Sequence, residues 1–144
     1  NIRELQIGDW VYYGKKAQYP MQITSIFGCL GDDDGTVYLD FEGNEGDIWD
    51  VNIEDMRPIP ITRELLEKNG FKRSENNVWR DYEVEVTWDY ETTDMQSFTL
   101  EKYPNDENLV CGYGSCLWNG VNVRYVHELQ NAMRMVGIEW NIKL

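Results

Sequence analysis

Residues 81–91 alternate strictly between apolar and polar side chains, and this alternation limits the possible folds more than any other feature. One parity holds Tyr82, Val84, Val86, Trp88 and Tyr90, and the other holds Asp81, Glu83, Glu85, Thr87, Asp89 and Glu91. A two-residue period is that of a β-strand with one face buried and one face in water. Burying an unpaired carboxylate costs of the order of several kcal/mol. We therefore expect the acidic side of this strand to face water or a basic partner.

The second half of the chain carries further signals of a small antiparallel sheet. Residues 97–101 predict a second strand that pairs with the first across a polar turn. Asn119-Gly120 is a strong hairpin signal, which predicts a turn between strands at 115–118 and 121–123. Residues 138–144 alternate more loosely and predict a last strand.

Two helices are expected in the same half. Thr62 is the expected N-cap of a short helix that runs to about Asn69, with Gly70 to end it. The second helix ends at Gly137. Its apolar stripe, which would pack on the sheet, consists of Val126, Leu129, Ala132, Met133 and Val136.

Residues 1–60 predict a different unit, built from short strands and glycine-containing turns. The strands are expected at 10–13, 22–26, 37–41 and 48–51. Pro58 and Pro60 then end this unit, because proline interrupts ladder pairing. The fold class is therefore α+β: an N-terminal SH3-like β-barrel over 1–60, followed by an antiparallel sheet with two helices over 61–144. The two parts either form separate domains or pack as one compact domain.

Acidic residues dominate the charge of the 144-residue chain, whose formal net charge is −13. Residues 32–55 contain ten acids and no base, and residues 81–107 contain nine acids against Lys102 alone. Binding to duplex nucleic acid depends on a basic surface, so this balance argues against direct nucleic-acid binding. The chain has no apolar run of about 18 residues that would span a membrane, and its start lacks the apolar segment of a secretion signal.

The chain has three cysteines, Cys29, Cys111 and Cys116. Their number is odd, and their spacing matches neither a zinc ribbon nor a dense disulfide framework. This pattern favours a reducing compartment, and we expect a cytoplasmic protein with part-buried thiols. A catalytic role for Cys116 would need a basic neighbour, for which His127 is the only imidazole in the chain. A hydrolase that uses these two residues is the weakest of the functional alternatives.

The segment His127-Glu128-Leu129-Gln130 begins like a zinc-protease signature, but Asn131 stands where the second histidine is required. An asparagine amide does not replace imidazole as a strong zinc ligand, so we expect a packing helix and no metal. Asp32-Asp33-Asp34-Gly35 does not hold the EF-hand register. The acidic loop 32–47 is expected to be a solvated turn, with an irregular calcium site as the alternative.

A basic stretch between the two acidic blocks suggests another kind of site. Guanidinium groups beside aromatic faces suit a flat, anionic ligand such as a nucleotide. Candidate ligand-binding residues are Arg63, Lys72, Arg73, Trp79, Arg80, Tyr82 and Arg124. Ion pairs with the acidic strands are the ordinary alternative for these cations.

Three blocks of sequence stand out together: 7–12 (IGDWVY), 57–71 (RPIPIT, then two leucines and NGF) and 126–131 (VHELQN). With these blocks the chain resembles a group of small proteins of gut anaerobic bacteria and of the phages and mobile elements that they carry. In that group the last block can read His-Glu-x-x-His, so the departure at Asn131 implies a role that does not need zinc. A phage origin implies a protein that counters or redirects a host system.

These observations favour a non-enzymatic, acidic binding protein that engages a basic host protein and needs no cofactor. Its candidate partner-binding residues are Asp81, Glu83, Glu85, Asp89 and Glu91. Excess negative charge speeds the encounter with a basic partner, and this effect weakens with salt. The alternative is a protein that sequesters a small nucleotide-like anion.

Overall fold

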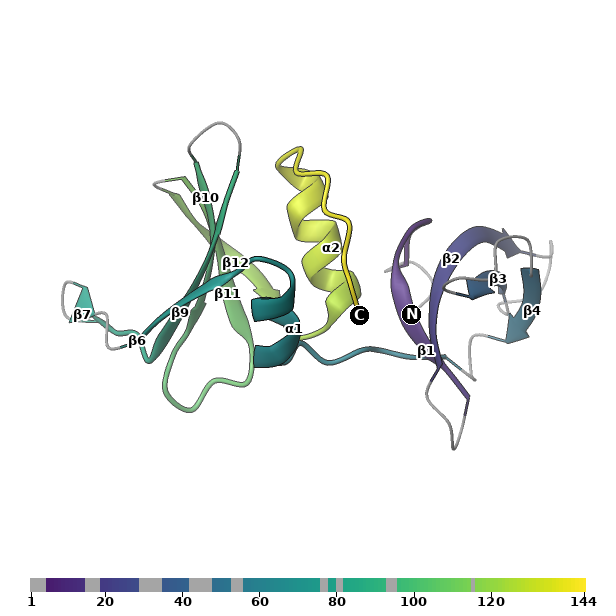
Figure 1. The fold of residues 1–144 in the computed structure, drawn as a ribbon, viewed down its shortest axis with the longest axis horizontal. Helices are drawn as coiled ribbons and strands as arrows, with labels where there is room; N and C mark the ends of the chain where they lie inside the picture. Colours follow the sequence, from purple (N-terminus) through teal and green to yellow (C-terminus); the bar gives the residue numbers. More distant parts are fainter. Residues whose placement is uncertain are drawn as a thin grey trace. The chain divides into compact units, whose positions relative to one another are not determined.

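The computed structural model describes residues 5–14, 19–28, 35–41, 48–52, 56–75, 78–79, 82–92, 96–114 and 116–144. These residues form an α+β structure of antiparallel sheets and two helices (Figure 1). The chain divides into two compact units. Unit 1 contains Asn1–Pro60 and Tyr125–Asn131, and unit 2 contains Ile61–Arg124 and Ala132–Leu144.

Unit 1 contains an antiparallel sheet of five strands in the order β4-β3-β2-β1-β5. The strands are β1 (Trp10–Tyr13), β2 (Tyr19–Gly28), β3 (Gly35–Phe41), β4 (Ile48–Asn52) and β5 (Met56–Arg57). The four strands expected from the sequence are confirmed, and β5 is a short addition. Among the described residues no pairing joins β4 to β5, so the sheet is not closed into a barrel by backbone hydrogen bonds there.

The core of unit 1 forms on one face of this sheet. Val11 lies directly opposite Met21 in the β1–β2 register, and both are buried together with Ile23. Tyr13 and Met56, which are also register partners, pack against this cluster. Alternate residues of β1 and β2 therefore form this cluster, and Trp10, on the other face of β1, is buried as well.

A tight turn leads into β1. Gly8 has φ of +94°, a backbone conformation that favours glycine. Its N–H donates to Ile23 O at 2.7 Å, and Asp9 O accepts from Ile23 N–H at 2.9 Å. The Asp9 side chain is buried, and its Oδ2 accepts from Gln6 N–H at 2.8 Å. The polar groups of this turn are therefore satisfied within the turn and by β2.

Unit 2 contains a second antiparallel sheet, in the order β12-β11-β10-β9-β6. Its strands are β6 (Lys72–Glu75), β9 (Val86–Glu91), β10 (Ser97–Lys102), β11 (Leu109–Tyr113) and β12 (Cys116–Val123). A separate pair consists of β7 (Val78–Trp79) and β8 (Tyr82–Glu83). The single strand expected over 81–91 is thus two strands, β8 and β9, with a break at Val84 and Glu85. The alternation did not reveal this break because its period continues through it.

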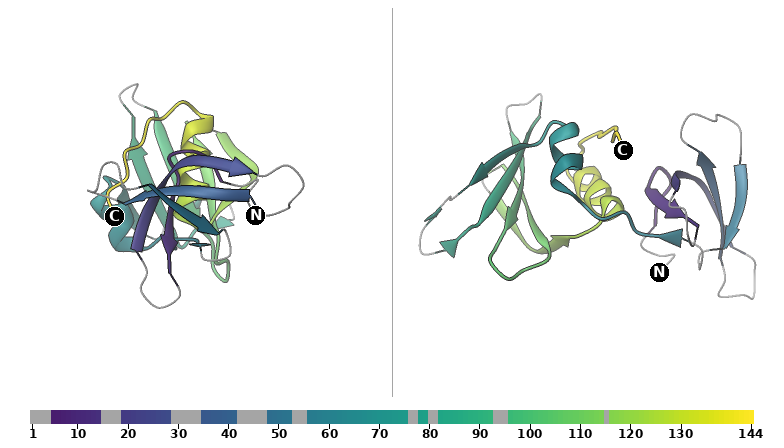
Figure 2. Two further views of the ribbon diagram at one scale, coloured as in Figure 1. Left: turned by 90° about the vertical axis from the view of Figure 1, so that its right-hand side faces the viewer. Right: turned by 60° about the horizontal axis from the view of Figure 1, so that its bottom comes forward.

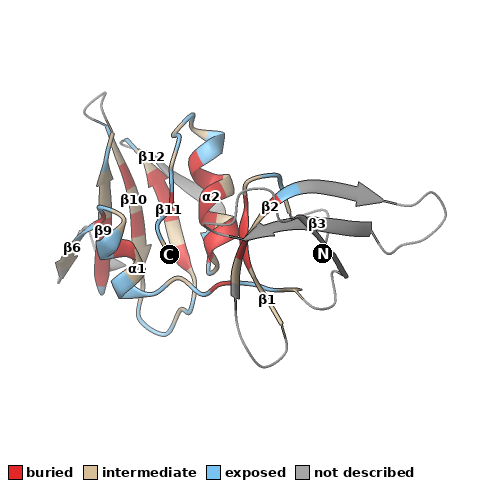
Figure 3. Cartoon of the chain, turned by 45° about the vertical axis from the view of Figure 1, so that its right-hand side comes forward, coloured by how far each residue is buried: buried red, intermediate tan, exposed pale blue. Residues whose placement is uncertain are grey.

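One face of the unit 2 sheet is apolar and buried, as the red stretches of β9, β10 and β11 show in Figure 3. Trp88, Leu100 and Cys111 are neighbours across the three strands and are all buried. Phe98 is also buried on this face. We call this the inner face and the opposite side the outer face.

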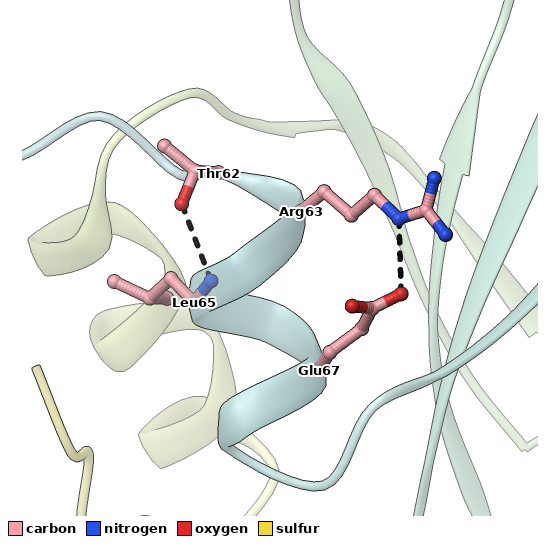
Figure 4. Close-up of polar contacts among 4 residues, drawn as sticks. All are labelled: Thr62, Arg63, Leu65 and Glu67. Carbon is pink, nitrogen blue, oxygen red and sulfur yellow. Dashed lines mark hydrogen bonds and ion pairs between the residues drawn. The ribbon is translucent and has the colours of Figure 1, made fainter.

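Helix α1 (Arg63–Lys68) begins and ends as expected. Thr62 Oγ1 accepts from Leu65 N–H at 3.2 Å, and Figure 4 shows this N-cap bond on the helix's first turn. At the other end, Phe71 N–H donates to Leu66 O at 3.0 Å, and Gly70 has φ of +89°. This bond and the left-handed glycine are the features of a Schellman termination.

Helix α2 (Val126–Met135) also matches its expected termination and its expected packing face. Ile138 N–H donates to Met133 O at 3.0 Å and Gly137 N–H donates to Arg134 O at 3.0 Å, again a Schellman motif. Val126, Leu129, Ala132 and Met133 are buried. No helix within the described ranges has the length and apolar character needed to cross a membrane.

The hairpin expected at Asn119-Gly120 is absent. The chain turns near Gly114, whose φ is +64°, and β12 then runs without interruption from Cys116 to Val123. Asn119-Gly120 instead falls where the β11–β12 register shifts between Val110 and Gly112. An irregular stretch of strand is another environment that tolerates glycine, so the dipeptide signal was assigned to the wrong structure.

The expected last strand over 138–144 is also absent. This segment leaves α2 at Gly137 and turns back, as its yellow trace shows in Figures 1 and 2. It bonds to side chains of the α1 end instead of a strand backbone: Asn69 Oδ1 accepts from Lys143 N–H at 2.7 Å. Apolar and polar residues do alternate between buried and exposed over 138–144, but this segment contacts the end of α1 and not the edge of a sheet.

Candidate protein-binding surface

The strand register assembles the outer face of unit 2 from residues far apart in sequence. Lys72, Asp89, Thr99 and Gly112 lie side by side across β6, β9, β10 and β11. Two residues further along, Ser74, Thr87, Glu101 and Val110 form a parallel row. The outer face therefore carries the carboxylates of Asp89 and Glu101 beside the cation of Lys72 and the hydroxyl groups of Ser74 and Thr99, whereas Thr87 is buried.

Hydrogen bonds orient two of its carboxylates. Thr99 Oγ1 donates to Asp89 Oδ1 at 3.1 Å, and Tyr103 OH donates to Glu101 Oε2 at 2.7 Å. All four of these residues are partly exposed. Each carboxylate has one oxygen engaged by a neutral donor, which orients the group without neutralising its charge.

Glu85 and Glu91 are exposed, whereas Asp89 between them is half-buried. Glu85 Oε2 lies 3.2 Å from Lys102 Nζ. Both side chains are well exposed, and an exposed pair of this kind is worth about 0.2–1 kcal/mol. A partner's cation can therefore replace Lys102 at little cost.

The five predicted partner-binding residues divide between the described and undescribed parts of the chain. Glu85, Asp89 and Glu91 lie at alternate positions in and just before β9, as the alternation predicted. Glu83 lies in β8 opposite Val78, with its side chain outside the described residues. Asp81 lies outside the described residues altogether.

Two of the predicted ligand-binding cations are engaged by carboxylates close to them. Arg63 Nε lies 3.0 Å from Glu67 Oε1 along α1, a pair drawn in Figure 4. Arg124 Nη1 lies 2.9 Å from Glu107 Oε2. Both contacts are ordinary ion pairs, but Glu67 lies on α1 and Glu107 lies between β10 and β11, so neither carboxylate belongs to the acidic strands that were expected to supply such pairs.

Lys72 and Arg73 are neighbours in β6 and therefore belong to opposite faces of the sheet. Lys72 is exposed and pairs in register with Asp89. The Arg73 guanidinium lies 5.7 Å from the Trp88 ring centroid, so it belongs to the inner face. The structure does not bring these two cations to one anion site.

The remaining ligand-binding candidates lie around the β7–β8 pair. Trp79 and Tyr82 are directly opposite each other in its register. Their side chains, and all of Arg80, lie outside the described residues. The acidic loop 32–47, considered above for calcium, is described only at residues 35–41, which form β3.

His127 is 7% exposed, and its ring stacks on Tyr125 with centroids 6.1 Å apart and planes 6° from parallel. Its Nδ1 is buried and has no hydrogen-bond partner among the residues that the structure describes. Cys116, the partner in the hydrolase hypothesis, belongs to unit 2 and His127 to unit 1, and the Cys116 side chain is outside the described residues. Within the described ranges no group of three His, Cys, Asp or Glu residues is arranged to hold a metal ion.

Glu101 and Thr99 were not among the predicted site residues. The strand at 97–101 was expected, but its pairing register with β9 was not, and the register decides which residues join Asp89 on one face. The alternation of Ser97, Thr99 and Glu101 opposite Phe98 and Leu100 is the signal that could have found them.

Parts of the three segments that carry the resemblance are hydrogen-bonded to one another within unit 1. Val126 N–H donates to Ile59 O at 2.8 Å, which joins the second block to the third. Gln130 Nε2 donates to Gly8 O at 3.0 Å, which joins the third block to the first. Comparison of the chain with protein-family models, curated proteins and solved structures finds no match.

Proposed function

We propose that the chain is a non-enzymatic binding protein whose outer face in unit 2 engages a basic protein. The observation that carries the proposal is the row of exposed and half-exposed carboxylates along β9, namely Glu85, Asp89 and Glu91. Glu101 extends this row onto β10. Lysine and arginine side chains of a partner would find accepting oxygens there that are not buried.

The net charge of the chain supports the same function. A net charge of −13 on 144 residues repels nucleic acid and attracts basic proteins over distances of about 10 Å at 0.1 M salt. Because exposed charges are screened, the association rate should fall steeply as ionic strength rises. The resemblance to phage and mobile-element proteins suggests a host protein as the partner. The cysteine content suggests that the two proteins bind in the cytoplasm.

The experiment compares two variants with the same change of net charge. The face variant carries Glu85→Gln and Glu91→Gln, and the control variant carries Glu64→Gln and Glu139→Gln. Glu64 and Glu139 are exposed but lie on α1 and beyond α2. Immobilised wild-type protein first captures a basic protein at low salt from a lysate of a gut anaerobe, and the recovered protein is then titrated against all three chains.

We expect the face variant to bind about tenfold more weakly than wild type at low salt, equivalent to about 1.4 kcal/mol. The control variant should differ from wild type by less than about twofold, and the affinity of wild type should fall with added salt. Equal weakening of both variants would mean that only net charge matters. A captured partner whose affinity ignores salt, or no basic protein captured at all, would also contradict the proposal.

We further propose that unit 1 is an SH3-like barrel. Its strand order, with β5 returning to pair beside β1, is the order of that fold. The long strand β2 also shifts register between Ile23 and Ser25, which is where a strand shared by two sheets would bend. Nuclear Overhauser effects from Val11 and Ile23 to side chains of β3 and β4 would support closure, and an open sheet in solution would contradict it.

A further inference from the structure

Residues 138–144 lie against the α1 end of unit 2 in the manner of a bound peptide. Ile142 is buried and Trp140 is half buried, whereas Glu139, Asn141 and Lys143 are exposed. This alternation is that of an extended segment with one side against a surface. We call residues 138–144 the strap.

One side chain holds the strap backbone. Asn69 Nδ2 donates to Lys143 O at 2.8 Å, and Asn69 Oδ1 accepts from Lys143 N–H at 2.7 Å. Asn69 Nδ2 also donates to Leu65 O at 2.8 Å, which fixes the carboxamide on the last turn of α1. The carboxamide thus bonds to both backbone groups of one strap residue.

Aromatic contacts hold the strap at a second position, Trp140. Trp140 meets Phe71 edge to face, with ring centroids 5.8 Å apart and planes at 83°. Phe71 is 3% exposed and is itself in contact with Tyr90, at 5.3 Å between centroids. Lys68 Nζ donates to Leu144 O at 2.6 Å at the far end of the strap. We call Lys68, Asn69 and Phe71 the strap site.

The arrangement has the features of a peptide-recognition site. A pair of hydrogen bonds from an asparagine to one backbone residue is independent of that residue's type, and apolar anchors at alternate positions give selectivity. The strap pairs with no strand among the described residues. The attachment of the strap to unit 2 therefore depends on a few side chains. This is typical of segments that open locally without global unfolding.

We propose that the strap site binds extended peptide segments of a partner protein, and that the strap is its occupant within the same chain. The recognised pattern is an aromatic residue, an aliphatic residue two positions later, and any residue after it, whose backbone bonds to Asn69. This binding is independent of the acidic outer face and does not rest on it. An incoming peptide displaces the strap and takes over its contacts.

The test uses the full chain and a fluorescent synthetic peptide of residues 138–144, followed by fluorescence anisotropy. Ile142→Ala weakens the strap and leaves the site intact, so this variant should bind the peptide at least tenfold more tightly than wild type. Asn69→Ala removes the backbone clamp from the site and should abolish binding, also when combined with Ile142→Ala. Asn122→Ala, an exposed asparagine on β12, is the matched control and should bind as wild type does.

A second measurement needs no substitution. Excess peptide added to the wild-type chain should speed hydrogen exchange at the Lys143 amide, because that amide leaves Asn69 Oδ1 when the strap is displaced. A peptide with serine in place of Trp140 and Ile142 should have no such effect. Unchanged exchange at Lys143 with the native peptide, or equal peptide affinity of wild type and Ile142→Ala, would overturn the proposal.

Discussion

The backbone N–H of Trp10 donates to Gln130 Oε1 at 2.9 Å, across 120 positions of sequence. The Gln130 carboxamide also donates to Gly8 O at 3.0 Å, and the side chain is only 5% exposed. One glutamine of α2 thus satisfies the backbone on both sides of Asp9. Gly8 O also accepts from Gln22 Nε2 at 3.1 Å, so it keeps a donor without Gln130, whereas Gln130 Oε1 is the acceptor for the Trp10 N–H at the start of β1.

Gln130→Ala should destabilise unit 1 by about 2 kcal/mol, because it leaves the Trp10 N–H buried without its acceptor. Urea denaturation followed by Trp fluorescence measures the loss. Gln96→Ala is the control, since Gln96 is exposed, and it should change stability by less than about 0.5 kcal/mol. Equal stability of the two variants would show that the Gln130 bond contributes nothing net.

Thr62→Ala should cost about 1 kcal/mol of unit 2 stability through loss of the N-cap bond to Leu65 N–H. Thr62→Ser keeps a hydroxyl acceptor at the same place. It should cost only about a few tenths of a kcal/mol, because serine caps helices at least as well as threonine does. Hydrogen exchange at the Leu65 amide reports the cap directly. Faster exchange in the serine variant than in the alanine variant would contradict this assignment.

Gly70→Ala and Gly137→Ala should each destabilise by about 1–2 kcal/mol, the strain of an L-residue in the left-handed region. A Cβ at Gly70 would meet Tyr90 Cε2 at 3.7 Å, an ordinary contact, and a Cβ at Gly137 would meet nothing within 4 Å. The two losses should therefore be similar. Thermal unfolding of both variants tests this, with Gly137→Asn expected to be milder than Gly137→Ala because asparagine tolerates this region. A much larger loss at Gly70 would mean that packing against Tyr90 is tighter than its distance indicates.

Arg63→Ala should lower stability by no more than about 0.5 kcal/mol, because the Arg63–Glu67 pair is exposed. The effect should vanish in about 1 M salt, where screening is strong. A double-mutant cycle with Glu67→Ala measures the pair. If wild type but not Arg63→Ala were stabilised by nucleotides, the anion-binding alternative would regain support.

Local signals predicted the helices and most strands correctly. The Thr62 cap and the glycines at 70 and 137 are features of a few neighbouring residues, so their meaning does not depend on the rest of the fold. The apolar stripe of α2 was likewise readable, since four of its five members are buried. What the stripe did not show is that Gln130, a polar residue, is buried among them.

Pairings between distant residues were beyond sequence reasoning. Asn119-Gly120 has the composition of a hairpin turn, but the pairing of β11 with β12 makes Gly114 the turn and places the dipeptide in a register shift. In the same way, the alternation of 138–144 was readable while its partner, Asn69, was not. The acidic face was foreseen on β9, and its extension to Glu101 required the β9–β10 register.

Unit 1 is discontinuous, since Tyr125–Asn131 joins Asn1–Pro60. During synthesis the first sixty residues leave the ribosome long before α2 does. The backbone groups of Trp10 and Ile59 therefore lack their hydrogen-bond partners on α2, Gln130 and Val126, until that helix is made. Contacts so distant along the chain slow folding. Nascent unit 1 therefore remains incomplete until residues 125–131 have been made and have left the ribosome, and a ribosome that stalls before them would leave it exposed to chaperones and proteases.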